Sequence, residues 1–396
     1  MNVYEKSVSL HKKYRGKMEM VPKFECNNYS DLSLAYSPGV AMPCQLIKQE
    51  ENASYELTNR GNTIAVISDG SAVLGLGNIG AYAALPVMEG KSLLFKKFAN
   101  IDAFPLCINT QDTEEIIKFC KLLEPCLGGI NLEDISAPRC VEIERRLCEE
   151  MNIPVFHDDQ HGTAIVVLAA LINVSRLLKK DPKDFKIIVS GTGAAGSSII
   201  KHLYNYGFTF INAFDINGCL VQEDYDSYDF LKKELLEYVN PQQHRFNNIG
   251  EALVGADVFI GVSVPGIVTK DMIKTMNEHS CIFALANPEP EIKYEDAIDA
   301  GAYIVGTGRS DFPNQINNIL AFPGLFKGAL TARAKKITNS EKIAASEALA
   351  YLITADELSP DYIIPSAFDE RVVDAVSNAV EASCHQRIEQ IDDPDF

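Results

Sequence analysis

Two pairs of neighbouring acidic residues are the side chains of this sequence best placed to do chemistry. Glu133-Asp134 and Asp158-Asp159 each follow a short apolar segment. If both segments are strands of one parallel sheet, the carboxylates meet at the strand ends, where such sheets bind ligands. A carboxylate set without cysteine suits Mg²⁺ or Mn²⁺. Asp158 or Asp159 could instead cap a helix that starts near Gly162, but the two pairs together favour a metal site.

The sequence also contains the pattern of a dinucleotide-binding loop. The apolar segment Phe185–Ser190 runs into a glycine-rich turn, and a helix is expected over Ser197–Tyr206. The turn consists of Gly191, Thr192, Gly193, Ala194, Ala195 and Gly196. Its glycines permit a tight turn, close approach of the backbone to a pyrophosphate and close helix packing, and the helix N-terminus attracts phosphate. A turn without a ligand is the alternative, but both flanking segments fit the dinucleotide interpretation.

Asp215 favours NAD as the dinucleotide. It ends the next apolar segment, where a carboxylate is expected to bind the adenosine ribose hydroxyls. The same carboxylate would repel the 2′-phosphate of NADP, and the following Ile216-Asn217-Gly218 offers no Lys or Arg to pair with it. The sequence therefore favours NAD and leaves NADP possible.

Two other patterns are not expected to bind ligands of their own. Gly75–Gly80 repeats the G-x-G-x-x-G spacing, but no strand leads directly into it, so we expect a turn and a close helix contact in the first domain. His157 and His161 have the spacing of zinc ligands on a helix, but the Glu of H-E-x-x-H is missing and a strand precedes them. We expect both histidines to be structural or to support the metal ligands.

Composition limits the possible partners. The 396 residues are enough for two domains, and 36 Lys plus Arg against 54 Asp plus Glu give a net charge of −18. This charge disfavours nucleic acid and anionic membrane surfaces. No uninterrupted apolar run reaches the roughly 18 residues of a membrane span. Scattered cysteines, mostly in apolar segments, predict reduced core thiols in a cytoplasmic protein; they include Cys26, Cys44, Cys107, Cys120 and Cys126.

Strands alternate with helices along most of the chain, which predicts an α/β protein after an N-terminal part of helices and turns. The expected strands are Thr63–Ser68, Asp102–Ile108, Ile130–Leu132, Ile153–Phe156, Phe185–Ser190, Phe208–Phe214, Val258–Val262, Cys281–Ala286 and Ala302–Val305. The expected helices are Thr113–Leu123, Val141–Met151, Thr163–Lys180, Ser197–Tyr206, Val372–Ala382 and one that follows a capping box at Thr338–Glu341. We predict two domains: residues 1–160 with a parallel sheet, and residues 161–396 with a doubly wound Rossmann-type sheet and C-terminal helices.

The sequence resembles the malic enzymes, in particular their short bacterial-type members, over nearly the whole chain. The motifs that carry the resemblance are Ala35–Val40, Ser68–Gly80, Glu89–Lys91, Asn131–Ile135, Phe156–Thr163, Ala286–Pro288 and Asn317-Asn318. The resemblance implies oxidative decarboxylation of L-malate to pyruvate and carbon dioxide with reduction of NAD or NADP. It also implies dependence on Mg²⁺ or Mn²⁺ and a homodimer.

The resemblance further implies roles for single residues. The metal ligands it implies are Glu133, Asp134 and Asp159, beside the catalytic residue Asp158. The substrate-binding residues it implies are Tyr36, Lys91, Asn287, Asn317 and Asn318. Among these, Lys91 would be the general base and Tyr36 the general acid, and Asn287 would also contact the cofactor.

Two points of chemistry depend on these roles. Lys91 must be neutral to accept a proton, and burial near a cation is expected to depress its pKa from about 10.4. The longer malic enzymes carry an arginine in the segment that matches Ser71-Ala72, so here that contact has to come from elsewhere.

Other interpretations stay open from the sequence alone. By spacing, Lys91 could be a surface lysine and Tyr36 a packing residue before a Pro-Gly turn. A malolactic enzyme would share the fold, NAD and Mn²⁺ but release lactate without net redox change. A non-catalytic dinucleotide-sensing module would leave both acidic pairs unexplained.

Overall fold

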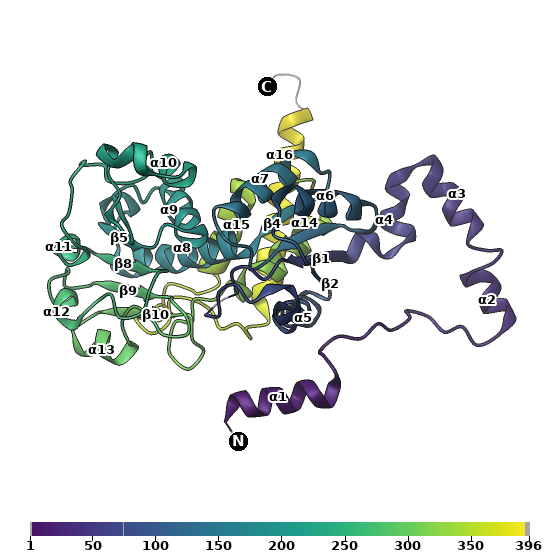
Figure 1. Cartoon of the computed structure of the whole chain (residues 1–396), viewed down its shortest axis with the longest axis horizontal. Helices are drawn as coiled ribbons and strands as arrows, with labels where there is room; N and C mark the ends of the chain where they lie inside the picture. The colour runs from purple at the N-terminus through teal and green to yellow at the C-terminus, as the bar shows by residue number, and fades with distance from the viewer. Residues whose placement is uncertain (1, 74, 393–396) are drawn as a thin grey trace.

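Four short apolar strands form the first sheet in the computed structural model, which describes residues 2–73 and 75–392 (Figure 1). The strands are β1 (Thr63–Ser68), β2 (Asp102–Cys107), β3 (Gly129–Leu132) and β4 (Val155–His157). They pair in parallel in the order β2-β1-β3-β4. Leu132 lies opposite His157, so the segments that follow β3 and β4 start side by side.

Helices cover both faces of this sheet, as a parallel sheet requires. The helices of the first unit are α5 (Gly80–Ala99), α6 (Thr113–Leu123) and α7 (Arg139–Glu150). On one face, Ile116 of α6 and Ile143 of α7 pack against the sheet. On the other face, Phe95 of α5 packs against Phe322 and Phe326 from the C-terminal part of the chain.

The second sheet is the doubly wound sheet predicted from the sequence. Its strands are β5 (Ile187–Ser190), β6 (Ile211–Asp215), β7 (Gly218–Cys219), β8 (Val258–Gly261), β9 (Cys281–Ala284) and β10 (Ile304–Thr307). The order is β10-β9-β8-β5-β6-β7, and only the short edge strand β7 is antiparallel. The surrounding helices are α9 (Ala194–Tyr206), α10 (Phe230–Leu235), α11 (Ile249–Leu253), α12 (Lys270–Ile273) and α13 (Tyr294–Asp299). The next strands along the chain lie on opposite sides of β5, with β6 on one side and β8 on the other, and such a switch in strand order opens a ligand crevice at the carboxyl ends of the strands.

A long buried helix, α8 (Asp158–Leu178), connects the two sheets. It begins at Asp158, earlier than the start near Gly162 expected from the sequence. Its length and apolar composition would suffice to cross a membrane, but most of this stretch is buried inside the protein, which is typical of a core helix. The predicted domain boundary at residue 160 therefore falls within α8.

The C-terminal helices return to the first sheet. They are α14 (Phe322–Thr331), α15 (Asn339–Tyr351) and α16 (Arg371–Asp392). The capping box predicted at Thr338–Glu341 is present at the start of α15. Phe326 of α14 packs edge-on against Phe156 of β4, and one continuous apolar core includes residues of both sheets.

The N-terminal part is helical, as predicted, but it packs little against the rest of the chain. Its helices are α1 (Val3–Tyr14), α2 (Tyr29–Ala35), α3 (Ala41–Gln49) and α4 (Ser54–Leu57). None of the residues in α1, α2 or α3 is buried, and α2 and α3 project from the two sheets (Figure 1). We call residues 24–50 the projecting arm.

All ten cysteines are free thiols, and the prediction that they lie in the core is only partly right. Burial is complete for Cys120, Cys140, Cys219, Cys281 and Cys384. In contrast, Cys26, Cys44 and Cys126 are exposed. The first two of these lie in the projecting arm, where apolar neighbours in the sequence have no core to pack into.

Candidate active site

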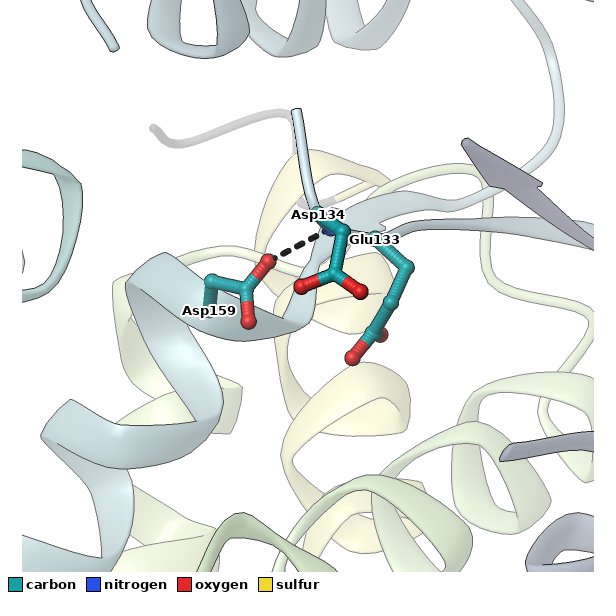
Figure 2. Close-up of side chains that lie close together, drawn as sticks. All are labelled: Glu133, Asp134 and Asp159. Atoms are coloured by element: carbon teal, nitrogen blue, oxygen red, sulfur yellow. Dashed lines mark hydrogen bonds between the residues drawn. The ribbon is translucent and has the colours of Figure 1, made fainter. Parts of the chain in front are cut away.

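The carboxylates predicted to bind metal meet at the ends of β3 and β4. Glu133 and Asp134 follow β3, and Asp159 lies in the first turn of α8, directly after β4. One oxygen of each side chain lies within 4.8 Å of the others (Figure 2). The backbone N–H of Asp134 donates to Asp159 Oδ2 at 2.8 Å. The structure thus brings together the three predicted ligands.

These three carboxylates fit a hard divalent cation. Glu133 and Asp134 are both buried. Burial raises the pKa of Glu133 and the pKa of Asp159 above their usual values, although the Lys91 ammonium opposes this shift. Negative charges that share a buried space need a compensating cation. An all-oxygen donor set suits Mg²⁺ or Mn²⁺ better than zinc.

Lys91 is a buried member of this site and not a surface lysine. Its Nζ lies 2.6 Å from Asp158 Oδ2 and 2.9 Å from Glu133 Oε1, above the ring of Phe322. Burial lowers the pKa of Lys91, but the two carboxylates outweigh burial and raise the pKa above its ordinary value. The expected depression of this pKa is therefore wrong for this arrangement, because both carboxylates contact the ammonium directly.

Asp158 and Asp159 do not cap α8 with their side chains. The N-cap residue is His157, and it makes no side-chain cap hydrogen bond. Asp158 Oδ2 accepts hydrogen bonds from Lys91 Nζ and from Asn318 Nδ2. Carboxylates in a first turn also interact favourably with the helix dipole. The hydrogen bonds of Asp158 and Asp159, however, are made with other residues of the site and not with the N–H groups of α8.

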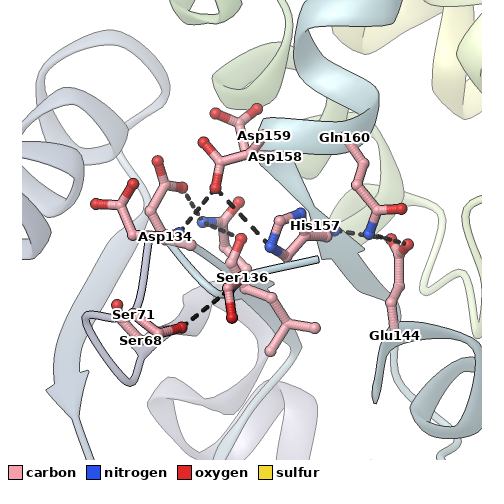
Figure 3. A network of polar contacts seen from close by, with 12 residues as sticks. Ser68, Ser71, Asp134, Ser136, Glu144, His157, Asp158, Asp159 and Gln160 are labelled. Atoms are coloured by element: carbon pink, nitrogen blue, oxygen red, sulfur yellow. Dashed lines mark hydrogen bonds and ion pairs between the residues drawn. The ribbon is translucent and has the colours of Figure 1, made fainter. Parts of the chain in front are cut away.

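Glu144 of α7 fixes the turn that carries the second acidic pair, a role that sequence reasoning missed. Its Oε1 accepts the backbone N–H of His157 at 2.8 Å, and its Oε2 accepts from Gln160 Nε2 at 3.1 Å (Figure 3). The same Oε2 lies 2.9 Å from His161 Nε2. Burial works to raise the pKa of Glu144, but His161 lowers it to about 2. No local sequence signal marks Glu144, because its partners lie on another element.

His161 contacts Glu144 and so supports the turn of the second acidic pair, whereas neither ring nitrogen of His157 has a hydrogen-bond partner among the described residues. Burial lowers the pKa of His157 to about 4, and its Nε2 lies 3.8 Å from Asp159 Oδ2. His161 Nδ1 lies 2.8 Å from Ser198 Oγ in α9, the helix that follows the glycine-rich turn. A chain of hydrogen bonds through Glu144, His161 and Ser198 therefore connects the turn that carries the second acidic pair with α9.

The carboxylates border a cavity of about 540 Å³ between the two sheets. Two of the acidic residues, Asp134 and Asp159, line it together with Asn287, Asn317 and Asn318. The amide groups can donate hydrogen bonds to a carboxylate. Among the described residues that line this cavity there is no Lys or Arg. An acidic ligand in this cavity would therefore meet neutral amides, and any positive charge would have to come from a cation held by the carboxylates.

Arg139 of α7 lies beside the position where the sequence lacks an arginine. Its Nη2 donates to Ser71 Oγ at 3.0 Å and lies 2.9 Å from Asp69 Oδ2. Arg139 is not among the residues that line the cavity, whereas Ala72 is. Arg139 therefore stabilises the segment that contains Ala72 without replacing the missing side chain in the cavity.

The glycine pattern at Gly75–Gly80 forms a turn before α5, as predicted. A Cβ atom on Gly70 would lie 2.4 Å from the carbonyl oxygen of Gly80, which explains the close contact at the helix start. The turn also approaches the second sheet, which was not expected: a Cβ atom on Gly75 would lie 3.1 Å from Pro288 Cδ. Gly75 and Gly77 line the 540 Å³ cavity.

A second cavity of about 460 Å³ lies over the predicted dinucleotide-binding turn. The predicted cofactor residues that line it are Gly191, Thr192, Gly193 and Asp215. Three others, Ala194, Ala195 and Asn287, line the 540 Å³ cavity instead, and Gly196 lines neither of the two. Ser263 borders both cavities, so together they form one groove from the turn to the carboxylates.

Two of the three glycines of this turn, Gly191 and Gly196, occupy positions where a side chain would collide. Gly191 has a φ of 105°, and its Cβ would lie 2.5 Å from the carbonyl oxygen of Val262. A Cβ on Gly196 would lie 1.8 Å from the carbonyl oxygen of Gly191. Gly193 has open space at its Cβ position and is the N-cap of α9, which leaves room for a phosphate at the helix N-terminus.

Asp215 has a cationic partner that sequence reasoning missed. Lys232, in α10, lies with its Nζ 2.6 Å from Asp215 Oδ2, and both residues line the 460 Å³ cavity. Lys232 lies 17 residues after Asp215, so the segment Ile216-Asn217-Gly218 gives no sign of it. A lysine that reaches Asp215 from another helix weakens the sequence-based case against a 2′-phosphate.

The structure does not bring Tyr36 to the site within one chain. Tyr36 is the C-cap of α2 in the projecting arm, and 70% of its surface is exposed. Its backbone bonds only to Leu32 and Val40, both in the same arm. Of the residues predicted for acid–base chemistry, Lys91 and Asp158 are in place and Tyr36 is not.

Comparisons with known proteins agree with this arrangement. The family model described as malic enzyme, N-terminal domain, matches residues 15–148, and that described as malic enzyme, NAD binding domain, matches residues 160–385. The chain is 53% identical to a bifunctional malic/malolactic enzyme of Bacillus subtilis over 96% of this chain and 92% of that protein. It is 48% identical to an NAD-dependent malic enzyme of Geobacillus stearothermophilus over 96% of this chain and 78% of that protein.

A solved structure extends the likeness to the fold. The crystal structure of an NAD-dependent malic enzyme from Thermotoga maritima has a TM-score of 0.91 and 49% identity, over 95% of this chain and 98% of that chain. The two family models, the near-complete coverage of these relatives and the shared two-sheet architecture show that the chain belongs to the malic enzyme family.

Proposed function

We propose that this malic enzyme oxidises and decarboxylates L-malate to pyruvate and carbon dioxide at the end of the first sheet, with NAD or NADP as oxidant. The observation that carries the proposal is the meeting of Glu133, Asp134 and Asp159 beside the buried Lys91, in a groove that continues to the glycine-rich turn. No other part of the described chain combines a carboxylate triad with a dinucleotide-binding turn.

Glu133, Asp134 and Asp159 would hold Mg²⁺ or Mn²⁺, and the turn with Asp215 would hold the dinucleotide. When bound, the cation supplies Lewis-acid polarisation of the hydroxyl and carboxyl oxygens of malate, and the nicotinamide accepts hydride from C2. The protein contributes binding, orientation and proton transfer, which the side chains around the cavity can provide.

Lys91 is the proposed general base, and Asp158 is the group that orients it. The Nζ of Lys91 must first lose its own proton, which Glu133 and Asp158 hold in place by their charge. Neutralisation of Glu133 by a bound cation would lower the pKa of Lys91 toward the range of a general base. Lys91 would then take the proton of the C2 hydroxyl as hydride leaves C2, return it to the same oxygen when carbon dioxide departs and the enol forms, and take it again when the enol becomes the ketone of pyruvate.

Asn287, Asn317 and Asn318 are proposed to bind the carboxylates of malate. Asn318 also donates to Asp158, so it positions the base system as well as the substrate. Asn317 accepts the backbone N–H of Ile319 at 3.0 Å through its Oδ1, which leaves its amide N–H groups directed to other partners. Asn287 borders the cavity where substrate and nicotinamide would meet.

Three further points belong to the same proposal. Tyr36 remains the proposed proton donor to C3 after carbon dioxide leaves, which requires it to reach a site in a dimer. We propose a cytoplasmic homodimer, consistent with ten free thiols. We keep NAD as the preferred dinucleotide because of Asp215, while Lys232 makes NADP the alternative.

The test uses L-malate with Mn²⁺ and either NAD or NADP. The reduced cofactor is followed by absorbance, and the product is assigned as pyruvate or lactate. We expect pyruvate and reduced cofactor in equal amounts, no reaction in EDTA, and a higher kcat/KM with NAD. Turnover that continues in EDTA would refute the metal site.

Malolactic chemistry is the second candidate, because a relative with 53% identity is named a bifunctional malic/malolactic enzyme. Lactate would form without net accumulation of reduced cofactor. The same assay distinguishes the two reactions, and both products together would indicate a bifunctional enzyme. Binding of dinucleotide without any turnover would indicate a sensing module.

A further inference from the structure

A buried carboxylate outside the metal site lies at the ends of β8 and β9. Glu291, in the segment between β9 and α13, has none of its surface exposed. It is not among the described residues that line either cavity of the groove. In the part of the chain that the structure describes, no Lys, Arg or His forms an ion pair with it. A buried negative charge without a cationic partner is costly, so stability does not explain its presence.

Neutral hydrogen-bond donors surround this carboxylate. Its Oε1 accepts the backbone N–H of Ser263 at 2.8 Å, and its Oε2 accepts that of Ala286 at 3.1 Å. The hydroxyl of Ser263 lies 3.4 Å from the same Oε1. Burial raises the pKa of Glu291, and these donors oppose the shift because they stabilise the charged form. The arrangement is that of an anion held by neutral groups.

The strand ends leave space for this side chain and connect it with the glycine-rich turn. Gly261 is the last residue of β8, and a Cβ atom on it would lie 2.3 Å from Glu291 Cδ. Two residues later, Ser263 Oγ lies 2.8 Å from the Oγ of Ser190, which directly precedes the turn. Glu291 therefore holds the loops after β8 and β9 together and, through Ser263, contacts the end of β5.

The loops that Glu291 holds border the groove where its two cavities meet. Ser263 lines both cavities, and Ala286 and Asn287 line the 540 Å³ cavity. A dinucleotide with its adenosine at Asp215 and its pyrophosphate at the glycine-rich turn has to pass Ser263 to bring its nicotinamide to the carboxylates. Glu291 therefore lies behind the loops that border the nicotinamide part of the groove.

The charge of the nicotinamide depends on its redox state. The oxidised ring carries one positive charge, and the reduced ring is neutral. The described residues that line the 540 Å³ cavity include no Lys or Arg, so no cationic side chain there offsets a negative charge behind the loops. Opposite charges attract more strongly where water is excluded. A buried anion at this place acts on the oxidised ring and not on the reduced one.

We propose that Glu291 is a positioning residue whose buried negative charge raises the affinity of the groove for the oxidised dinucleotide relative to the reduced one. The inference rests on the proposed function only in that the groove binds the dinucleotide. The hydrogen bonds of Glu291 hold the loops at Ser263 and Ala286, and its charge attracts the cationic ring across them. Because the reduced ring lacks this attraction, the reduced cofactor leaves the site more readily.

The test compares three probes, NAD⁺, NADH and ADP-ribose, which has no nicotinamide. Their dissociation constants are measured by isothermal titration calorimetry without malate or metal, for wild type and for Glu291→Gln. The glutamine keeps the size of the side chain and removes its charge. We expect the ratio of Kd for NADH to Kd for NAD⁺ to fall by at least about fivefold, and Kd for ADP-ribose to change by less than about twofold. The ratio cancels any loop displacement that both forms of the cofactor feel equally.

Glu341→Gln is the matched control. Glu341 is also fully buried and accepts the backbone N–H of Thr338 at 2.6 Å, but it lies at the start of α15 and lines neither cavity. The substitution should lower Tm and leave the ratio as in wild type. An unchanged ratio in Glu291→Gln, or an equal change in Glu341→Gln, would overturn the inference.

Glu291→Asp separates charge from loop position and decides the question if Glu291→Gln does not fold. The aspartate keeps the charge on a shorter side chain, so we expect weaker binding of both cofactor forms and a ratio within about twofold of wild type. A ratio that falls although the charge remains would assign the effect to the loops and refute the inference. Failure of wild type to bind any dinucleotide would count against the proposed function instead.

Discussion

Lys91 is the side chain on which the proposed chemistry depends most. Lys91→Ala should lower kcat for malate oxidation by at least about 100-fold, because a general base typically contributes this much. The dissociation constant for NAD should stay unchanged, since Lys91 does not line the cavity over the glycine-rich turn. Steady-state kinetics and cofactor titration measure both.

Lys96→Ala is the matched control for this substitution. Lys96 lies on the same helix, but it is exposed and pairs with Asp102 at 2.8 Å. Removal of such a surface pair is expected to cost less than about 1 kcal/mol in stability and nothing in catalysis. Retention of more than about a tenth of the rate in Lys91→Ala would contradict its role as base.

Gly162 is required by the position of Asp158. A Cβ atom on Gly162 would lie 2.0 Å from Asp158 Oδ1, so Gly162→Ala must displace the carboxylate that holds Lys91. We expect kcat to fall by at least about tenfold, as in other cases where a catalytic group is misplaced by about 1 Å. Gly90→Ala on α5 is the control, because its Cβ would meet only Lys17 Nζ at 4.0 Å. Equal activities of the two variants would refute this explanation.

At the residue scale, the sequence predicts the site residues that directly follow an apolar strand. It does not predict side chains that contact the site from helices elsewhere in the chain. Glu133, Asp134 and Asp159 could be predicted together because each follows a recognisable strand in a parallel sheet. The pKa of Lys91 could not, because it depends on contact with Asp158 across two elements. Lys232 was missed for the same reason.

At the scale of elements, Glu144 connects α7 with the turn between β4 and α8. Glu144→Gln keeps the size of the side chain but removes the charge that interacts with His161, and it places an amide N–H where acceptors are needed. We expect Mn²⁺ affinity to fall by about five- to 100-fold, since a disturbed buried hydrogen-bond group costs about 1–3 kcal/mol. Electron paramagnetic resonance of free Mn²⁺ measures this without turnover.

The control for Glu144→Gln is Glu149→Gln on the same helix. Glu149 is exposed and lies outside the hydrogen bonds that hold the turn, so the substitution should leave Mn²⁺ affinity within error of wild type. An unchanged Mn²⁺ affinity in Glu144→Gln would show that the turn holds its shape without this carboxylate.

Most elements were predictable because their apolar runs are buried on both faces. The sequence places β1 at Thr63–Ser68 and α6 at Thr113–Leu123, as observed. The start of α8 was missed because Glu144 of α7, and not a local cap, holds its first turn. The edge strand β7 was missed because its two residues have no hydrophobic pattern.

At the scale of the whole molecule, acid should destabilise the fold through buried histidines. Burial lowers the pKa of His202 to about 3, and its Nε2 lies 3.0 Å from Ser346 Oγ. A histidine in the unfolded chain titrates near about 6.5. As the pH falls below that value, the unfolded chain takes up a proton that the folded chain does not, so the free energy of unfolding falls until the pH reaches about 3.

His202→Gln should flatten this dependence. At pH 5 the histidine is expected to cost about 2 kcal/mol of stability relative to neutral pH, and the glutamine variant should not lose this amount. Thermal unfolding at both pH values measures it. His279→Gln, which removes an exposed histidine, should behave as wild type. A steeper loss of Tm in His202→Gln than in wild type would contradict the prediction.

Arrangements between distant parts of the chain were beyond the sequence. The sequence predicts helices in the last part of the chain, but nothing in the pattern shows that Phe322 and Phe326 return to the first sheet. The sequence predicts helices and turns in the arm. It could not predict that the arm projects, because this depends on how little the arm packs against the rest of the chain. Packing between remote segments depends on how the shapes of their side chains fit together. Hydrophobic periodicity along the sequence does not show this fit.

The return of α14 to the first sheet has a consequence for synthesis of the enzyme. During translation, all the acidic side chains of the triad emerge long before Asn318 and Phe322. Asn318 donates a hydrogen bond to Asp158, and the ring of Phe322 lies beneath the Lys91 ammonium. A ribosome-bound chain, or the product of a premature stop codon before this point, would contain the carboxylates but lack Asn318 and Phe322, which contact Asp158 and Lys91. Catalytic competence is therefore acquired late, after most of the polypeptide has left the exit tunnel.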